Sequence, residues 1–149
     1  MSDPDIPILA NGGIIQPPGP AWIEAGERVV PIRMIEQEEL GRQYDKLCTQ
    51  PSDIVNHLPR FVELCEALDA QHVIELGSRS GVSTVAWLYG LAKTGGHLTS
   101  VDLDPAPEIG SWSHWRHIQG DDLSMDVLGQ LDGADIVFID TSHLYEQTV

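Results

Sequence analysis

The fold is decided by residues 73–87, which read V-I-E-L-G-S-R-S-G-V-S-T-V-A-W. A short apolar run that ends at Leu76 has the length and composition of a buried strand. A glycine-containing turn follows, and the apolar segment from Val82 to Lys93 has helical length. The order strand, glycine turn, helix predicts the first unit of an α/β fold.

Three more strand signals follow along the chain, at residues 97–102, 116–119 and 134–140. Residues 123–131 can form a brief helix, whereas residues 103–115 contain too much proline and glycine for more than a short one. Strands that alternate with helices favour right-handed crossovers and a mostly parallel sheet. We therefore expect a doubly wound α/β fold with about four strands over residues 72–149.

The first 71 residues divide into two expected parts. Residues 1–33 are rich in proline and glycine, which interrupt helix and sheet hydrogen bonding, and we expect an arm there. Residues 34–71 are expected to form helices, because apolar side chains recur at spacings of three and four from Ile54 onward. Pro59 must either kink the second helix or lie in the first turn of a further segment.

Composition excludes several classes of protein. The 149 residues are enough for one domain, and Lys plus Arg total 8 against 23 Asp plus Glu, a formal net charge of -15. Nucleic-acid binding rests on cationic contacts, so no nucleic-acid partner is expected. No apolar run approaches the roughly 18 residues of a membrane span, and the start lacks a secretory signal, so we expect a cytoplasmic chain with no membrane partner.

Cys48 and Cys65 lack metal-type spacing and are expected to be ordinary thiols.

Acidic residues stand at or near the end of every predicted strand. In an open parallel sheet, ligands bind at the carboxyl ends of the strands. Carboxylates stand there at Glu75, Asp102, Asp121 with Asp122, and Asp140. Such a rim repels a phosphate-rich ligand and suits one with ribose hydroxyls, an exocyclic amine and a cationic centre. S-adenosylmethionine (SAM) has all three.

Residues 73–87 resemble the first motif of class I SAM-dependent methyltransferases, in the branch that includes small-molecule and sugar O-methyltransferases. Residues 51–59 and 139–146 resemble the same branch, so the resemblance covers roughly residues 48–149. It implies a Rossmann-like sheet, SAM as cofactor and seven strands. Because only about four strands can be read, we expect a chain truncated after strand four, a fragment, or a subunit that a partner completes.

The resemblance also implies which residues contact the nucleoside. Asp102 would accept both ribose hydroxyls, with Leu103 beside it. Asp121 would accept from the adenine amine, and the backbone N–H of Asp122 would face a ring nitrogen, although these two could exchange roles. A simpler alternative is that the acids cap turns or stand in solvent.

A second group of implied residues belongs to the glycine-containing turn. Gly77 and Gly81 would let the backbone approach the methionine part of the cofactor, and Glu75 would organise the turn. Arg79 stands where the family usually has glycine and could contact the cofactor carboxylate. The full cofactor set is Glu75, Gly77, Ser78, Arg79, Gly81, Asp102, Leu103, Asp121 and Asp122.

Two residues are candidates for catalysis. His143 could take the proton of a hydroxyl substrate, because histidine titrates near neutral pH, or it could be structural. Asp140 could orient that histidine or bind a divalent ion such as Mg²⁺. The other histidines form no ligand-like pair and are expected to be structural or surface residues.

Three functions are weighed. The favoured one is a SAM-dependent methyltransferase that O-methylates a small molecule or sugar. The second is a catalytically inactive cofactor-binding or interaction module, and a homo-oligomer is one way to complete it. An NAD-dependent oxidoreductase is disfavoured, because Gly77 and Gly81 do not give the G-x-G-x-x-G spacing of dinucleotide folds.

Overall fold

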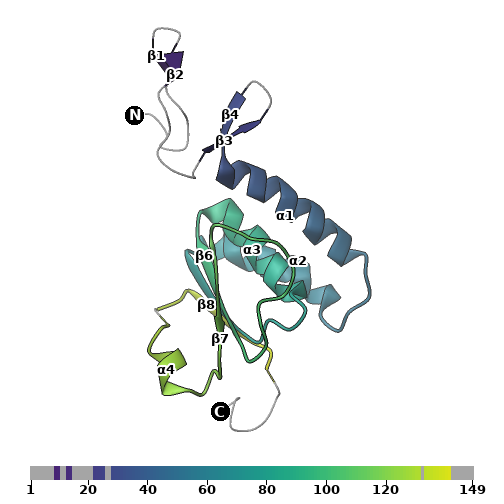
Figure 1. The fold of residues 1–149 in the computed structure, drawn as a ribbon. Coiled ribbons are helices and arrows are strands. Elements are labelled where there is room, and N and C mark those ends of the chain that lie inside the picture. Colours follow the sequence, from purple (N-terminus) through teal and green to yellow (C-terminus); the bar gives the residue numbers. More distant parts are fainter. Residues whose placement is uncertain (1–8, 11–12, 15–21, 26–27, 132, 142–149) are drawn as a thin grey trace.

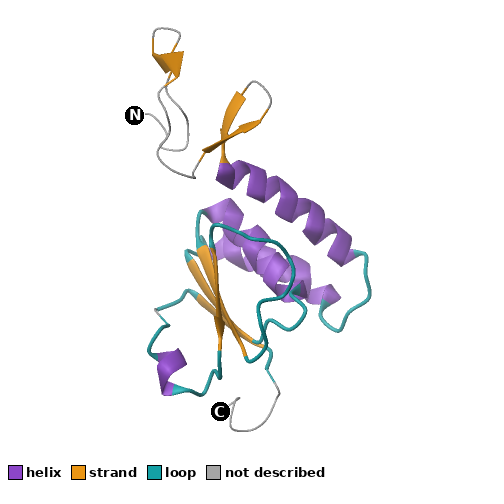
Figure 2. Cartoon of the chain, in the orientation of Figure 1, coloured by secondary structure: helices purple, strands orange, loops and turns teal. Residues whose placement is uncertain are grey.

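The computed structural model describes residues 9–10, 13–14, 22–25, 28–131 and 133–141. Its centre is a parallel sheet with three long helices on one side and a short helix, α4 (Met125–Leu128), on the other (Figure 1). Outside the helices and strands, most of the described chain is loop (Figure 2). This arrangement confirms the predicted α/β fold class.

The sheet has the strand order β7-β6-β5-β8, and every neighbouring pair is parallel. The strands are β5 (His72–Leu76), β6 (His97–Asp102), β7 (Trp115–Gln119) and β8 (Ile136–Ile139). Because all four strands run the same way, their carboxyl ends lie along one edge of the sheet. The acids at or just after the ends of the strands are therefore brought to that edge.

The core lies between the sheet and the helices α1 (Ile32–Cys48), α2 (Leu58–Leu68) and α3 (Val82–Thr94). Helix α3 is apolar almost all round, as expected of a helix covered by both its neighbours and the sheet. Trp87 of α3 stacks on Phe61 of α2 with 4.5 Å between the ring centroids, and both contact Phe138 of β8. These aromatic contacts fix α2 and α3 over β8.

Pro59 lies at the start of a helix and not in its interior. A 3-10 turn, η2 (Val55–His57), precedes α2, and Pro59 lies in the first turn of α2, where its missing N–H costs no helical hydrogen bond. The second helix is therefore unkinked by this proline. Helix α1 begins at Ile32, two residues before the expected start.

The N-terminal region differs from the expectation that proline and glycine would interrupt sheet bonding. It forms two antiparallel pairs, β1 (Leu9–Ala10) with β2 (Gly13–Ile14), and β3 (Trp22–Ala25) with β4 (Arg28–Pro31). These ladders are very short, and Pro31 stands at the end of its strand. Proline is tolerated at such an end because no further ladder bond is required of it.

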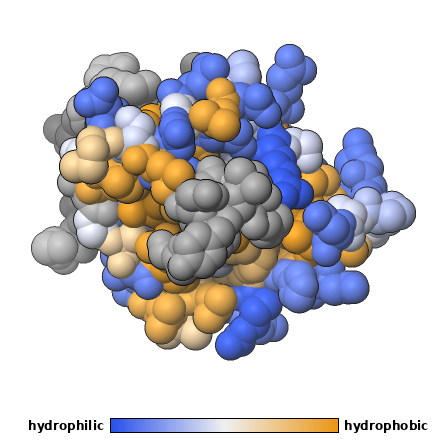
Figure 3. Space-filling view, turned by 90° about the horizontal axis from the view of Figure 1, so that it is seen from below, coloured by the Kyte–Doolittle hydropathy of each residue, from blue (hydrophilic) through white to orange (hydrophobic). Residues whose placement is uncertain are grey.

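The face of the sheet opposite the three helices is only partly covered. Val101, Ile118 and Val127 form a small second cluster under α4. On β8, Val137 and Ile139 are 55% and 47% exposed. Seen from below, the surface carries separate hydrophobic patches among hydrophilic residues (Figure 3). Within the described ranges, no helix has the length and apolar character to cross a membrane.

Candidate functional site

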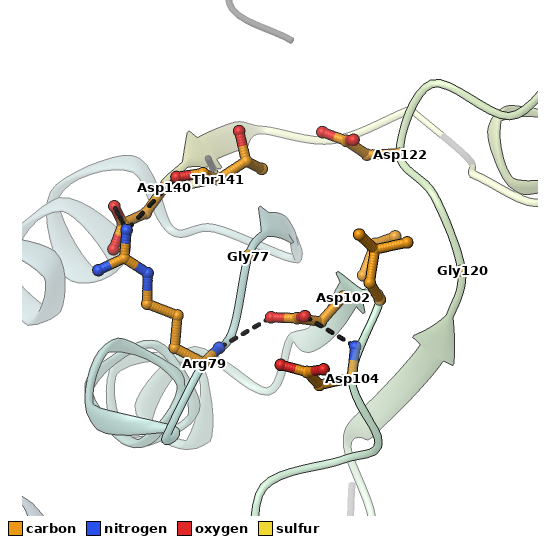
Figure 4. A pocket seen from close by; sticks show the side chains of 10 residues that line it. Gly77, Arg79, Asp102, Asp104, Gly120, Asp122, Asp140 and Thr141 are labelled. Carbon is orange, nitrogen blue, oxygen red and sulfur yellow. Dashed lines mark hydrogen bonds and ion pairs between the residues drawn. The ribbon is translucent and has the colours of Figure 1, made fainter. Parts of the chain in front are cut away.

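A cavity of about 630 Å³ opens at the carboxyl edge of the sheet (Figure 4). Its volume falls within the range of small-molecule sites. Four aspartates and one arginine contribute to its described lining, so the cavity is acidic. The lining residues are Gly77, Arg79, Val101, Asp102, Leu103, Asp104, Gly120, Asp122, Asp140 and Thr141.

Asp102 lies at the centre of the cavity and also shapes its walls. Its Oδ2 accepts the backbone N–H groups of Ser78 and Arg79, both at 2.9 Å, and its Oδ1 accepts that of Asp104 at 3.0 Å. Burial alone would raise the pKa of Asp102, but these backbone hydrogen bonds outweigh it and lower the pKa. The carboxylate is therefore ionised, and it connects the turn after β5 to the loop after β6.

The turn between β5 and α3 needs its glycines for packing. Gly77 has φ +95° and Gly81 has φ +92°, a region that favours glycine. A Cβ on Gly77 would collide with the backbone oxygen of Asp140, and one on Gly81 would lie 2.6 Å from Cγ2 of Ile109. Gly77 lines the cavity, whereas Gly81 packs against the loop after β6 and is not in the lining.

Arg79 joins two walls of the cavity. Its backbone N–H reaches Asp102, and its guanidinium lies 3.3 Å from Oδ1 of Asp140 and 3.3 Å from the carbonyl oxygen of Thr141 (Figure 4). A third contact, at 3.5 Å, is to Asp53 before η2. Among the described lining residues, Arg79 is the one basic side chain. It is also a non-glycine residue at φ +47°, so the turn tolerates local strain at this position.

Glu75 lies under the site rather than in it. Its side chain is fully buried and accepts hydrogen bonds from the hydroxyls of Ser83, Thr84 and Ser100. Burial raises the pKa of Glu75 to about 7, although the three hydroxyls act in the opposite direction. Because Ser83 and Thr84 belong to the first turn of α3, Glu75 organises the turn from below and does not line the cavity.

The two acids after β7 are separated by the structure. Asp121 is exposed and its Oδ1 accepts the N–H of Leu123 at 2.9 Å, which makes it a turn cap. Asp122 is 9% exposed and lines the cavity. The expectation that Asp121 meets the ligand is therefore not matched by its position, and of the two exchangeable acids Asp122 is the one in the cavity.

The remaining cofactor candidates take different positions. Leu103 lines the cavity, as expected of a neighbour of Asp102. Ser78 is buried, is absent from the lining, and uses its N–H and hydroxyl on Asp102. Asp104 and Thr141 are lining residues that the sequence analysis missed, although each lies within two residues of an acid that it singled out.

Of the two catalytic candidates, Asp140 lines the cavity and forms an ion pair with Arg79. His143 lies outside the described residues. In the part of the chain that the structure describes, no group of three or more His, Cys, Asp or Glu side chains could bind a metal ion. The Mg²⁺ prediction therefore stays untested.

The chain is similar to known proteins in sequence and in fold. One family profile, described as "Methyltransferase domain", matches residues 74–149. No curated protein matches significantly. Among solved structures, the chain is similar to SAH-bound methyltransferase PaMTH1 of Podospora anserina, with 18% identity, a TM-score of 0.49, and coverage of 69% of this chain and 50% of that one. It is also similar to cmcI with Mg and SAM, with 19% identity, a TM-score of 0.48, and coverage of 63% and 43%.

The family match covers half of the chain; it begins within β5 and includes the glycine turn, the acidic edge and β8. The chain therefore belongs to the methyltransferase-domain family, and the resemblance to class I SAM-dependent methyltransferases is confirmed. The chain spans half or less of the length of the two solved structures named above.

Proposed function

We propose that the cavity binds SAM and that the protein is a methyltransferase acting on the hydroxyl group of a small molecule or sugar. The observation that carries this proposal is the cavity at the carboxyl edge of the sheet, with the ionised Asp102 at its centre and Asp122 on its wall. Both acids can accept hydrogen bonds from hydroxyl or amine donors. The methyltransferase family match supports the same assignment.

The described residues fit the chemistry of SAM. The acidic lining attracts a cationic centre, and the nucleoside supplies hydroxyl and amine donors for the carboxylates. Oγ1 of Thr141 is buried in the lining and has no hydrogen-bond partner within the described residues. A buried polar atom without a partner is costly, and a polar ligand in the cavity would satisfy it.

When bound, SAM supplies a methyl group on a cationic sulfur, which a nucleophile can attack. The protein then needs to exclude water, orient the acceptor and remove the proton of its hydroxyl. We assign the proton acceptor to His143, as inferred from the sequence. The guanidinium of Arg79 pairs with Asp140 and holds its side chain at the edge of the cavity.

The proposed acceptor class follows from the charge of the cavity. A phosphorylated or strongly anionic acceptor would meet Asp104, Asp122 and Asp140, with Arg79 alone to offset them. A neutral hydroxylated molecule can donate hydrogen bonds to the same groups. Sugars and hydroxylated small molecules are therefore favoured over anionic acceptors.

A second candidate is a module that binds the cofactor without turnover. The observation that favours it is the incomplete cover of the sheet beside β8, where Val137 and Ile139 are exposed. Such a module would bind SAM and S-adenosylhomocysteine (SAH) through the same residues. Transfer of labelled methyl from SAM to a pool of sugars and hydroxylated small molecules separates the two functions.

The decisive experiment is calorimetric titration of the full chain with SAH and with NAD. We expect SAH to bind and NAD not to bind, because the acidic lining repels a pyrophosphate. Asp122→Asn should weaken SAH binding about tenfold or more, the loss expected for a hydrogen bond to a charged group. Asp121→Asn is the matched control, because its side-chain oxygen can still accept from Leu123, and it should bind SAH like the parent protein. Absence of SAH binding would overturn the proposal.

A further inference from the structure

One wall of the cavity is made by irregular chain. Leu103 and Asp104 line the cavity directly after β6, and no helix or strand forms between there and β7. We refer to Leu103 and Asp104 as the β6 wall. Irregular backbone has no helix or strand ladder to hold it in place, so its position depends on contacts with other parts of the chain.

Two side chains of β7 supply donors to this wall. His117 Nε2 lies 3.2 Å from the carbonyl oxygen of Asp104, and Gln119 Nε2 donates to that of Leu103 at 3.2 Å. A third bond runs from the N–H of Asp104 to Oδ1 of Asp102. The carbonyl oxygens of Leu103 and Asp104 are thus both bonded to side chains of β7. The N–H of Asp104 is bonded to Asp102, the central acid of the cavity.

The register of the sheet explains why these two side chains reach the wall. His117 is paired with Ser100, and Gln119 is paired with Asp102. Residues two apart on a strand point to the same face, so His117 and Gln119 share the face of Asp102. The loop after β6 returns over that face, which brings its carbonyls within reach of both side chains.

The chemistry of the His117 contact is unambiguous. A carbonyl oxygen can only accept, so Nε2 carries the hydrogen. Nδ1 is buried without a hydrogen-bond partner among the described residues, so the contact to Asp104 is the one hydrogen bond of the ring there. The ring also makes an edge contact with Trp115, 6.0 Å between centroids, which restricts its orientation.

We propose that His117 and Gln119 are positioning residues for the cofactor cavity, which hold the β6 wall beside Asp102 through its two carbonyl oxygens. The inference rests on the proposed function for the identity of the ligand. Neither side chain lines the cavity, so each acts through the backbone of the wall. Without the two donors, the wall has to be ordered when the ligand binds, and the cost of that ordering lowers affinity.

The test uses variants that remove or retain the donor. His117→Leu and Gln119→Met remove it, whereas His117→Gln retains an N–H at a similar reach. Gln71→Met is the matched control, because the side-chain amide of Gln71 also donates to backbone carbonyls, those of Asp69 and Thr94, and lies away from the cavity. Each full-length variant is measured by SAH calorimetry and by hydrogen–deuterium exchange of the segment around residues 103–106 in the ligand-free protein.

We expect His117→Leu and Gln119→Met each to speed exchange in the wall segment and to weaken SAH binding about fivefold, the effect of losing one neutral hydrogen bond. His117→Gln should restore both readouts toward those of the parent, and Gln71→Met should change neither. Unchanged SAH affinity in the His117→Leu, Gln119→Met double variant would overturn the inference. So would unchanged exchange. Failure of the parent protein to bind SAH would instead overturn the proposed function, and the exchange data would still report whether the two side chains order the wall.

Discussion

At the scale of single residues, the site is built from acids with unequal tasks. Asp121 and Asp122 are neighbours in sequence, yet one caps a turn in solvent and the other is nearly buried in the cavity wall. The sequence identified the pair but could not separate its members, because the difference depends on how the chain turns after β7. The sequence predicts that two acids stand after a strand, but it does not show which of the two side chains points into the cavity.

Glu75 gives a prediction about pH. Its pKa of about 7 in the folded protein lies above the ordinary 4.5, so the folded state retains a proton that the unfolded state has released. Unfolding free energy therefore falls as pH rises from about 4.5 to about 7 and levels above that. Glu75→Gln removes this dependence. From about pH 5 to about pH 8, the unfolding free energy of the variant relative to the parent should rise by about 2 to 3 kcal/mol.

Denaturant unfolding of both proteins at the two pH values measures this difference. Glu75 is fully buried, so solvent screening does not reduce the effect. Thr99→Ser, a substitution in the neighbouring strand that adds no charge, serves as the control and should keep a constant offset from the parent. A constant offset for Glu75→Gln as well would mean that Glu75 titrates normally in the folded protein.

At the scale of elements, the turn between β5 and α3 depends on close packing of backbone against backbone. Gly77→Ala would place a methyl group against the carbonyl of Asp140, which belongs to the main chain and cannot rotate away. It would also require a positive φ that alanine disfavours. We expect a loss of more than about 2 kcal/mol in unfolding free energy, together with loss of SAH binding.

Gly133→Ala is the matched control for this substitution. A Cβ there meets nothing within 4 Å, so the unfolding free energy should stay within about 0.5 kcal/mol of the parent. Thermal and denaturant unfolding of both variants measure the contrast. A change of no more than about 0.5 kcal/mol for Gly77→Ala as well would show that the turn tolerates a side chain at Gly77.

The elements themselves could be predicted to a large extent from the sequence. The four strands and α3 were readable because apolar runs of strand length alternate with a helical segment bounded by glycines. The short antiparallel strand pairs near the N-terminus are not predictable in this way, because proline and glycine are expected to interrupt regular hydrogen bonding there. The contacts of His117 and Gln119 were also unreadable, since they depend on the β6–β7 register and on a loop that returns over one face.

At the scale of the whole molecule, charge is the dominant property. The chain carries a formal net charge of -15, and the cavity lining is itself acidic. SAM differs from SAH by a methyl group and the positive charge on sulfur. The field of the protein should therefore favour SAM over SAH at low ionic strength and lose that preference as salt screens it.

This yields a prediction about ionic strength. Between about 0.02 M and about 0.5 M NaCl, the affinity for SAM should fall at least about threefold more than the affinity for SAH. Calorimetry with both ligands at both salt concentrations measures the ratio directly. SAH is the internal control, because non-electrostatic effects of salt act on both ligands. Equal salt dependence would argue against a cationic centre bound near the acidic lining.

The hydrogen bonds of Asp102 have a practical consequence for protein engineering. Both of its carboxylate oxygens already accept main-chain N–H groups, so any replacement at Asp102 alters two loops along with any ligand contact. Retuning this protein toward analogues of its ligand is better begun at Asp122, whose replacement leaves those connections intact.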